Sequence, residues 1–220
     1  MKKIIKNLFP FLLHIKNKFY TIKRRKLLSK CKDDLLDSLE LLSKKININY
    51  WLEYGTMLGA VRENKIIAHD YDLDIGILES DWSFAIRNEL KKLNIKLIRE
   101  IKIDNKTIEE TYLFKGILFD IFYCELDNNI LKTPVFRPFS GSNWLESINM
   151  YGGIELYYFD NNFTGFSQVQ LENKNMKIPK NYHSHLCSYY GDNYMTPIPN
   201  WKGNNAAYST NKLGIEINLN

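Results

Sequence analysis

The chain has 220 residues, of which 30 are Lys or Arg and 25 are Asp or Glu, and its formal net charge is +5. The charge is uneven, because residues 1–32 contain 11 basic and no acidic side chains, which leaves 19 basic and 25 acidic ones, a net −6, in residues 33–220. An acidic body argues against a nucleic-acid-binding protein, whose surface is normally basic. A hydrophobic content of 45% excludes a wholly disordered chain.

Residues 1–32 predict a basic, amphipathic helical arm. Their longest apolar run, 8–13, contains Pro10 and is far shorter than the roughly 20 apolar residues of a membrane-spanning helix. Further lysines follow where a signal peptide would have its small-residue cleavage site. Cations that flank apolar residues favour an arm lying on an anionic membrane surface, and packing of the arm on the body is the alternative.

The cysteines add a prediction about the compartment. Cys31, Cys124 and Cys187 are odd in number and widely spaced, and they form no Cys-x-x-Cys or Cys/His pattern. Neither a disulfide framework nor a structural zinc site is therefore expected. Together with the arm, this predicts a cytoplasmic protein that is peripheral at the inner face of a membrane.

Hydrophobic spacing predicts the elements that follow the arm. Residues 33–46 are expected to form a helix that starts at two acidic residues, and residues 50–54 a short strand. The further expected elements are one or two helical turns over 56–62, a strand over 73–78, a helix capped by Ser80 or Asp81, and strands over 95–99, 107–114 and 117–123, the last two joined by a turn at Lys115-Gly116.

The pattern weakens in the second half of the chain. Residues 126–175 have no clear period, residues 182–190 predict a helix that ends at Gly191, and the tail from Thr196 predicts irregular structure. Because no repeat or linker composition interrupts 33–220, we expect one domain there, after the arm of residues 1–32.

A pair of acidic residues carries the clearest chemical signal. Asp72 and Asp74 are two apart on a predicted strand, so their side chains share one face, about 6.5–7 Å apart. Two carboxylates this close repel unless something neutralises them. A hard divalent cation such as Mg²⁺ does so, and it usually takes one or two protein carboxylates together with water and phosphate oxygens. On spacing alone, solvated turn residues are the alternative.

A third acid and a glycine complete the pattern. Asp120 stands alone in an apolar strand, and an acid is seldom buried without a partner. If its strand runs beside residues 73–78, the three carboxylates form one site, in which Asp120 can accept a proton from an acceptor hydroxyl. Gly55 and Thr56 stand where a phosphate can approach the backbone and the hydroxyl.

These residues resemble the motifs of the LicD family, which includes the fukutin-type proteins. The family has a Gly-Thr-Leu-Leu-Gly-x-x-Arg motif, similar to residues 55–62, and then an acidic Asp-Asp-Asp-x-Asp segment, similar to 70–74. Its Val-Asp-Ile-Phe strand resembles 119–122, and its C-terminal Pro-Lys and Tyr-Gly-Asp signature resembles 179–180 and 190–197. His69 and Tyr71 depart from the family pattern, which has Trp and Asp there.

The resemblance implies an α+β, nucleotidyltransferase-like fold with a small mixed β-sheet flanked by helices. It implies that Asp72, Asp74 and Asp120 hold Mg²⁺, or Mn²⁺, and carry the chemistry. Asp70 would lie behind these ligands, and the residues implied to bind substrate are Gly55, Thr56, Arg62, Asp70, Lys180 and Asp192.

The activity that the resemblance implies is metal-dependent transfer of a phospho-substituent, such as phosphocholine or ribitol phosphate, from a CDP-activated donor. The acceptor would be a sugar of a cell-surface glycan, free or lipid-linked, of the teichoic-acid or lipopolysaccharide type. Two alternatives stay open: a nucleotidyltransferase that moves NMP, and a non-catalytic module for glycan assembly.

Overall fold

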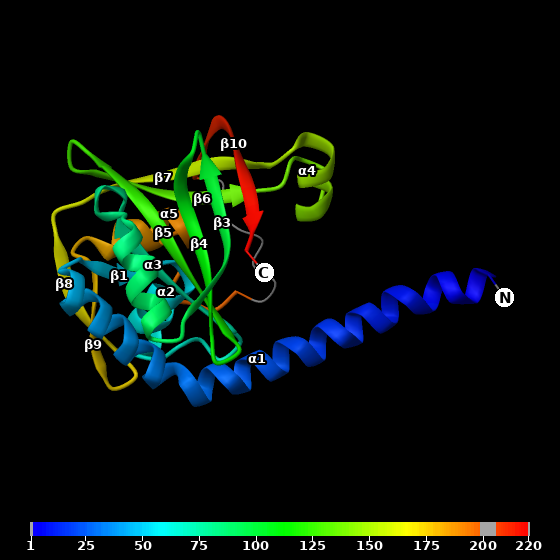
Figure 1. Ribbon diagram of the computed structural model, residues 1–220, viewed down its shortest axis with the longest axis horizontal. Coiled ribbons are helices and arrows are strands. Elements are labelled where there is room, and N and C mark those ends of the chain that lie inside the picture. Colours follow the sequence, from blue (N-terminus) through cyan, green and yellow to red (C-terminus); the bar gives the residue numbers. More distant parts are fainter. Residues whose placement is uncertain (1, 199–205, 220) are drawn as a thin grey trace.

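The computed structural model describes residues 2–198 and 206–219, with side chains described from residue 21 onward. Figure 1 shows helices arranged around a strongly curved sheet, with one long helix that runs away from it toward the N-terminus. The helices are α1 (Lys2–Ile46), α2 (Tyr54–Glu63), α3 (Phe84–Lys92), α4 (Trp144–Tyr151) and α5 (Tyr182–Tyr190), with a short 3₁₀ turn, η1 (Glu79–Asp81).

Eight strands form the main sheet in the order β1-β2-β5-β4-β3-β10-β7-β6. They are β1 (Tyr50–Leu52), β2 (Asp72–Leu78), β3 (Lys96–Ile103), β4 (Lys106–Phe114), β5 (Ile117–Asp127), β6 (Ile130–Arg137), β7 (Ile154–Asn162) and β10 (Tyr208–Asn218). Strands β8 (Phe166–Leu171) and β9 (Lys174–Pro179) form a separate hairpin.

The main sheet closes on itself, because β5 also pairs with β6. Strands β5, β4, β3, β10, β7 and β6 thus make a barrel-like ring, and β2 and β1 extend from it beside β5. The β2–β5 pairing is parallel, whereas the other pairings of the sheet are antiparallel. The predicted α+β class and mixed sheet are confirmed, while the barrel-like closure was not predicted.

Two of the three apolar clusters of the described chain lie on opposite sides of this sheet. The larger one packs α1, α2, α3 and α5 against strand residues such as Leu73, Ile75 and Ile121, all fully buried. The smaller one fills the ring with Ile101, Phe136 and other apolar side chains. Burial of apolar surface is the dominant favourable term in folding. It also fixes which face of each strand points toward a core.

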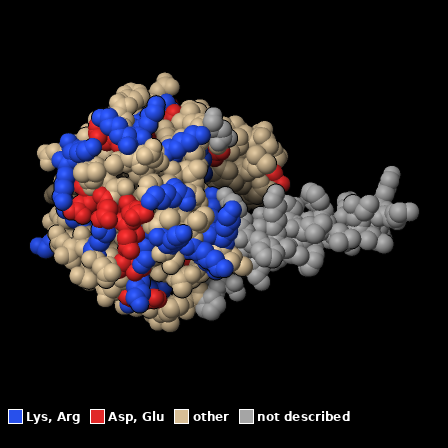
Figure 2. All heavy atoms as spheres, turned by 60° about the horizontal axis from the view of Figure 1, so that its bottom comes forward, with Lys and Arg blue, Asp and Glu red and all other residues tan. Residues whose placement is uncertain are grey.

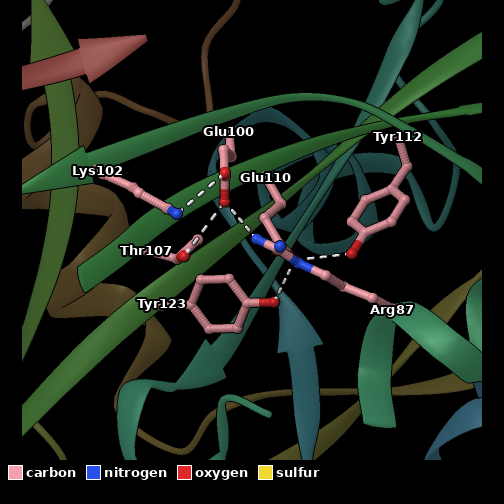
Figure 3. Close-up of polar contacts among 7 residues, drawn as sticks. All are labelled: Arg87, Glu100, Lys102, Thr107, Glu110, Tyr112 and Tyr123. Atoms are coloured by element: carbon pink, nitrogen blue, oxygen red, sulfur yellow. Dashed lines mark hydrogen bonds and ion pairs between the residues drawn. The ribbon is translucent and has the colours of Figure 1, made fainter. Parts of the chain in front are cut away.

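A buried ionic network fastens α3 to the sheet (Figure 3). Arg87 donates from Nε to Glu110 Oε1 at 2.5 Å, and its Nη2 pairs with Glu100. Tyr112 and Tyr123 donate their hydroxyls to Glu110 Oε2 at 2.7 and 2.6 Å. Each oxygen of this fully buried carboxylate therefore has a donor, which a buried charge requires.

Helix α1 corrects the predicted helix start. It runs unbroken from Lys2 to Ile46, so Asp33 and Asp34 lie within it and not in its first turn. The expected boundary between residues 32 and 33 falls inside this helix, with Cys31 and Leu35 buried on either side of it. Within the described residues, no helix is both long and apolar enough to cross a membrane.

Ion pairs between α1 and the body accompany this burial. Asp34 pairs with Lys115 at 2.5 Å, Asp37 pairs with Lys174, and Lys32 pairs with Glu172. Figure 2 shows the resulting mixture of charge, in which a group of acidic side chains is bordered by basic ones. The side chains of residues 1–20, on which the predicted membrane contact depends, lie outside those the structure describes.

Several other predicted boundaries were wrong. The first strand ends at Leu52, because α2 already starts at Tyr54. Ser80 and Asp81 lie in η1 and do not cap α3, which follows Ser83. The strands over 73–78, 107–114 and 117–123 and the helix over 182–190 are confirmed to within a few residues.

The weakly patterned regions contain regular structure after all. Residues 126–175 include β6, α4, β7, β8 and part of β9, and the described tail includes β10. In β10, Leu213, Ile215 and Ile217 alternate with other residues, yet only Gly214 is buried, so this alternation does not mark a face in the core. Its conformation comes from pairing with β3 and β7, which are distant in sequence.

Candidate active site

The parallel pairing of β2 and β5 brings the three predicted acids together. In this register Asp74 is opposite Asp120, and Asp72 is two residues before Asp74 on the same face of β2. Leu73 and Ile75 point to the other face, where both are fully buried in the core. The alternation of a strand thus explains how acidic and apolar residues coexist in this segment.

Asp70, on the loop before β2, belongs to the same group. A Cβ atom added to Gly55 would lie 3.3 Å from Asp70 Oδ2 and 3.9 Å from Asp74 Oδ2. Gly55, at the start of α2, therefore lies directly against two of the carboxylates. A larger residue there would crowd both of them.

Burial raises the pKa of each of these acids, and repulsion by neighbouring carboxylates adds to it for Asp72 and Asp74. Burial, followed by the charges of Asp120 and Asp70, raises the pKa of Asp72 to about 6. Burial, followed by the charges of Asp72 and Asp120, raises the pKa of Asp74 well above its usual value. Burial also raises the pKa of Asp120, against a hydrogen bond from Thr111 and the charge of Arg99. A cation bound here would reverse this penalty on ionisation.

The acids offer carboxylate oxygens, the kind of ligand that Mg²⁺ prefers. Asp120 Oδ1 is buried and accepts no hydrogen bond within the described part of the chain, and the Arg99 guanidinium is 3.8 Å from it. Across the described residues, no group of three or more His, Cys, Asp or Glu side chains is placed so that these side chains alone could hold a metal ion. Mg²⁺ requires only one or two carboxylates, with water and phosphate oxygens completing its shell.

Thr56 connects α2 to the acidic strand. Its hydroxyl oxygen accepts a hydrogen bond from the backbone N–H of Asp74 at 2.8 Å, and the N–H of Glu53 donates to the Asp74 carbonyl at 3.0 Å. Only 3% of Thr56 is exposed. The side chain that the sequence assigned to the donor is therefore one that holds Asp74 in position.

A pocket of about 160 Å³ opens beside these residues. Gly55, Arg62, His69 and Asp70 line one part of it, and the segment 194–198 lines another. Arg62 donates from Nε to the carbonyl of Tyr194 at 2.5 Å and from Nη2 to that of Thr196 at 3.3 Å. Arg62 thus attaches the C-terminal motif to α2 at the edge of the pocket.

The remaining predicted substrate residues lie elsewhere on the surface. Lys180 and Asp192 are both exposed, and neither lines the pocket. The sequence grouped them with the site only through the resemblance, and Asp192 lies between Tyr190 and Tyr194, which do line the pocket.

An arginine that the sequence did not indicate lies next to Asp120. Arg99, on β3, pairs with Glu109 at 2.5 Å, donates to Thr111 Oγ1 at 3.0 Å, and lies 3.8 Å from Glu216. Burial and the charge of Asp120 raise the pKa of Glu109 to about 8. Glu109 is one of two adjacent acids in a strand of mixed composition, so the lone-acid signal that marked Asp120 did not mark it.

Two further arginines reach the site from α1. Arg25 donates from Nε to the carbonyl of His69 at 2.8 Å, and the Arg24 guanidinium carbon is 5.9 Å from the centre of the Tyr71 ring. The charge of Arg24 opposes the effects that raise the pKa of Asp72. The sequence reasoning assigned both arginines to the membrane arm and so missed them.

Comparison with known proteins gives partial relatives. The chain is 52% identical over 64 residues to an uncharacterised protein of Rickettsia typhi, a match that covers 29% of this chain and 20% of that protein. It is 53% identical over 34 residues to mouse ribitol 5-phosphate transferase FKRP, covering 16% of this chain and 7% of that protein. The matches thus span at most a fifth of these relatives' lengths.

A family comparison covers far more of the chain. Residues 47–201 match the family model described as LicD/FKTN/FKRP, nucleotidyltransferase domain. The matched range includes α2, the acidic strand β2, Asp120 and the segment attached by Arg62, and it is more than half of the chain. The protein therefore belongs to the LicD/FKTN/FKRP family.

Proposed function

We propose that this protein is a phosphotransferase that modifies a glycan. It would transfer a phospho-substituent, such as ribitol phosphate or phosphocholine, from a CDP-activated donor to a sugar. What supports the proposal most is the register that sets Asp74 opposite Asp120, with Asp72 on the same face, in a chain of this family. One partial relative, ribitol 5-phosphate transferase FKRP, is by its name an enzyme of the same class.

In this proposal Asp72, Asp74 and Asp120 hold Mg²⁺, or Mn²⁺ in its place. The bound ion would neutralise the donor diphosphate as negative charge moves to the leaving nucleotide. Asp120, whose Oδ1 accepts no hydrogen bond from the described residues, would take the proton of the acceptor hydroxyl. Gly55 leaves the carboxylates of Asp70 and Asp74 uncrowded at the start of α2, and Thr56 keeps Asp74 in place.

Two other functions use parts of the same site. A nucleotidyltransferase would move NMP to the acceptor, and its product would be a nucleotidylated acceptor instead of free CMP. A non-catalytic assembly module would have no use for a metal. Four buried or half-buried carboxylates in one place destabilise the folded protein unless a cation neutralises them. This cost favours a catalytic role over a purely structural one.

The surroundings of the reaction belong to the proposal as well. The acceptor would be a cell-surface glycan or its lipid-linked precursor, of the teichoic-acid or lipopolysaccharide type. The protein would act in the cytoplasm, peripheral at the inner face of a membrane, through residues 1–32. No nucleic acid would be bound, because residues 33–220 carry a net negative charge.

The direct test is a set of CDP-linked donors, CDP-ribitol and CDP-choline among them, scored by CMP release with Mg²⁺ present. We expect release that stops when EDTA is added and falls about a hundredfold or more in Asp72→Asn and Asp74→Asn. Asp104→Asn is the matched control, because Asp104 is an exposed turn residue with a φ of 48°, which Asn tolerates. Full activity in either site variant would refute the assignment.

A further inference from the structure

Helix α1 carries two kinds of cation on two sides. Arg24, Leu28, Cys31 and Leu35 follow one another at intervals of four, three and four residues, so they share the stripe of the helix that faces the body. Leu28, Cys31 and Leu35 are buried, and Arg24 is half-buried. An arginine thus occupies the next position of an otherwise apolar stripe, where another apolar residue would be expected.

The lysines beside it face the other way. Lys23 and Lys26 are exposed, whereas Arg24 and its neighbour Arg25 are half-buried. Arginine suits phosphate better than lysine does, because its planar guanidinium can donate two parallel hydrogen bonds. The cations with the better geometry for phosphate thus lie on the inner side of the helix.

The geometry joins this stripe to the acidic residues. Arg25 Nε is bonded to the carbonyl of His69 at 2.8 Å, next to Asp70, and Arg25 and Asp70 also line one cavity of about 280 Å³. Arg24 lies over the ring of Tyr71, next to Asp72. The two arginines therefore contact His69 and Tyr71, the two neighbours of Asp70 on the loop that carries the acids.

The negative charge at the site would be stabilised by such cations. One divalent ion offsets two of the four carboxylates, and a nucleoside diphosphate would bring further negative charge. Arg62, which the sequence assigned to the donor, is bonded to the carbonyls of Tyr194 and Thr196, and Arg99 pairs with Glu109. The α1 arginines add positive charge at the loop that carries Asp70 and Asp72, where Arg25 is bonded to the carbonyl of His69 and Arg24 lies over the ring of Tyr71.

We propose that Arg24 and Arg25 of α1 form a phosphate-binding edge of the candidate active site, which binds the diphosphate of a nucleotide donor. The inference rests on the proposed function for the identity of the ligand. It also goes beyond the family, since both residues precede the matched range 47–201. The helix that would reach the membrane surface thus becomes part of the donor site.

The test measures binding, without turnover, by calorimetry of the full chain with Mg²⁺ and two probes, pyrophosphate and CDP. We expect Arg24→Gln to weaken binding of both at least about tenfold, the usual effect of losing a charged hydrogen bond. Arg24→Lys keeps the charge, so its affinity for both probes should lie between those of Arg24→Gln and the wild type. Lys23→Gln and Lys26→Gln, on the exposed side, should stay within about twofold of the wild type.

Several outcomes would overturn the site. They are unchanged binding in Arg24→Gln, an equal loss in Lys23→Gln, and a wild-type protein that binds neither probe. Circular dichroism checks the fold of each variant, and if Arg24→Gln unfolds, an Arg24→Lys variant that binds as well as the wild type would also overturn the site.

A second arm separates a donor phosphate from a lipid headgroup. The same variants are floated with vesicles of phosphatidylcholine, with and without phosphatidylglycerol. If Arg24→Gln loses vesicle binding but keeps pyrophosphate binding, the arginines contact lipid and the donor assignment is wrong. If pyrophosphate binding depends on Arg24 while no CDP-linked donor releases CMP, the anion site stands and the proposed function fails.

Discussion

Asp74 connects the acidic site to the rest of the molecule through its backbone. Its N–H is held by Thr56 and its carbonyl by the N–H of Glu53, both at the start of α2. Its side chain is opposite Asp120 on the neighbouring strand. One residue therefore fixes the position of the acids relative to Gly55 and the pocket, and we expect its backbone contacts to matter as much as its carboxylate.

Glu53 gives a prediction at the same scale. It is fully buried, accepts a hydrogen bond from Trp51 Nε1 at 2.6 Å, and has a pKa raised to about 7 by burial. Because the unfolded chain ionises Glu53 at lower pH than the folded one, stability should fall as pH rises from about 4.5 to about 7. Glu53→Gln removes this loss, about 3 kcal/mol above pH 7.

The measurement is the melting temperature between pH 4 and pH 8.5. The melting temperature of Glu53→Gln minus that of the wild type should be about 6–12 °C larger at pH 8.5 than at pH 4. Glu63→Gln, an exposed acid at the end of α2, should follow the wild-type curve. A difference between Glu53→Gln and the wild type that is the same at every pH would contradict the account.

Sequence reasoning found the acids but not their cationic neighbours. Asp72, Asp74 and Asp120 were predictable because carboxylates on apolar strands are rare unless they have a function. Arg24 and Arg99 were not, because their approach depends on how α1 packs and on the register between β3 and β4. Arg62 was found by its motif, yet its contacts with Tyr194 and Thr196 required the folded chain.

At the scale of elements, α3 depends on the ionic network beneath it. Arg87, on α3, satisfies Glu110 and Glu100, on β4 and β3. In Figure 3 the guanidinium lies between the two carboxylates, with the two tyrosine hydroxyls aimed at Glu110. Removing one partner of such a buried pair leaves the other charge uncompensated.

We therefore expect Arg87→Met to lower the free energy of unfolding by about 3–5 kcal/mol, as measured by urea denaturation. The double variant Arg87→Met/Glu110→Gln should recover part of this loss, because it no longer buries that unpaired carboxylate. Lys92→Met, an exposed partner of Glu89, should change stability by about 1 kcal/mol or less. A loss in Arg87→Met no larger than in Lys92→Met would show that the network does not stabilise α3.

The predictable elements are those with a one-sided apolar pattern. Strands β2, β4 and β5 and helix α5 were placed nearly correctly, because each has one face in the main core. Strands β6, β7 and β10 were not, since β10 pairs with the distant strands β3 and β7, and β6 contains Pro134. Proline and a mixed exposure pattern conceal such strands from local rules.

At the scale of the whole molecule, α1 joins two features that the sequence kept apart. The sequence divided the chain into a basic arm and an acidic body, whereas α1 passes without a break from one to the other. Its buried residues lie in the main core, and its arginines reach the loop that carries Asp70 and Asp72. The net charge of +5 is thus distributed so that cations of α1 meet the carboxylates of the body.

The proposed activity requires that the acids of β2 and β5 hold one divalent cation. Mn²⁺ titration of the full chain, followed by electron paramagnetic resonance with CDP present, measures this directly. We predict one bound Mn²⁺ in the wild type and in Asp104→Asn, and loss of that site in Asp74→Asn and Asp120→Asn. Equal Mn²⁺ binding in the wild type and both site variants would contradict the central claim.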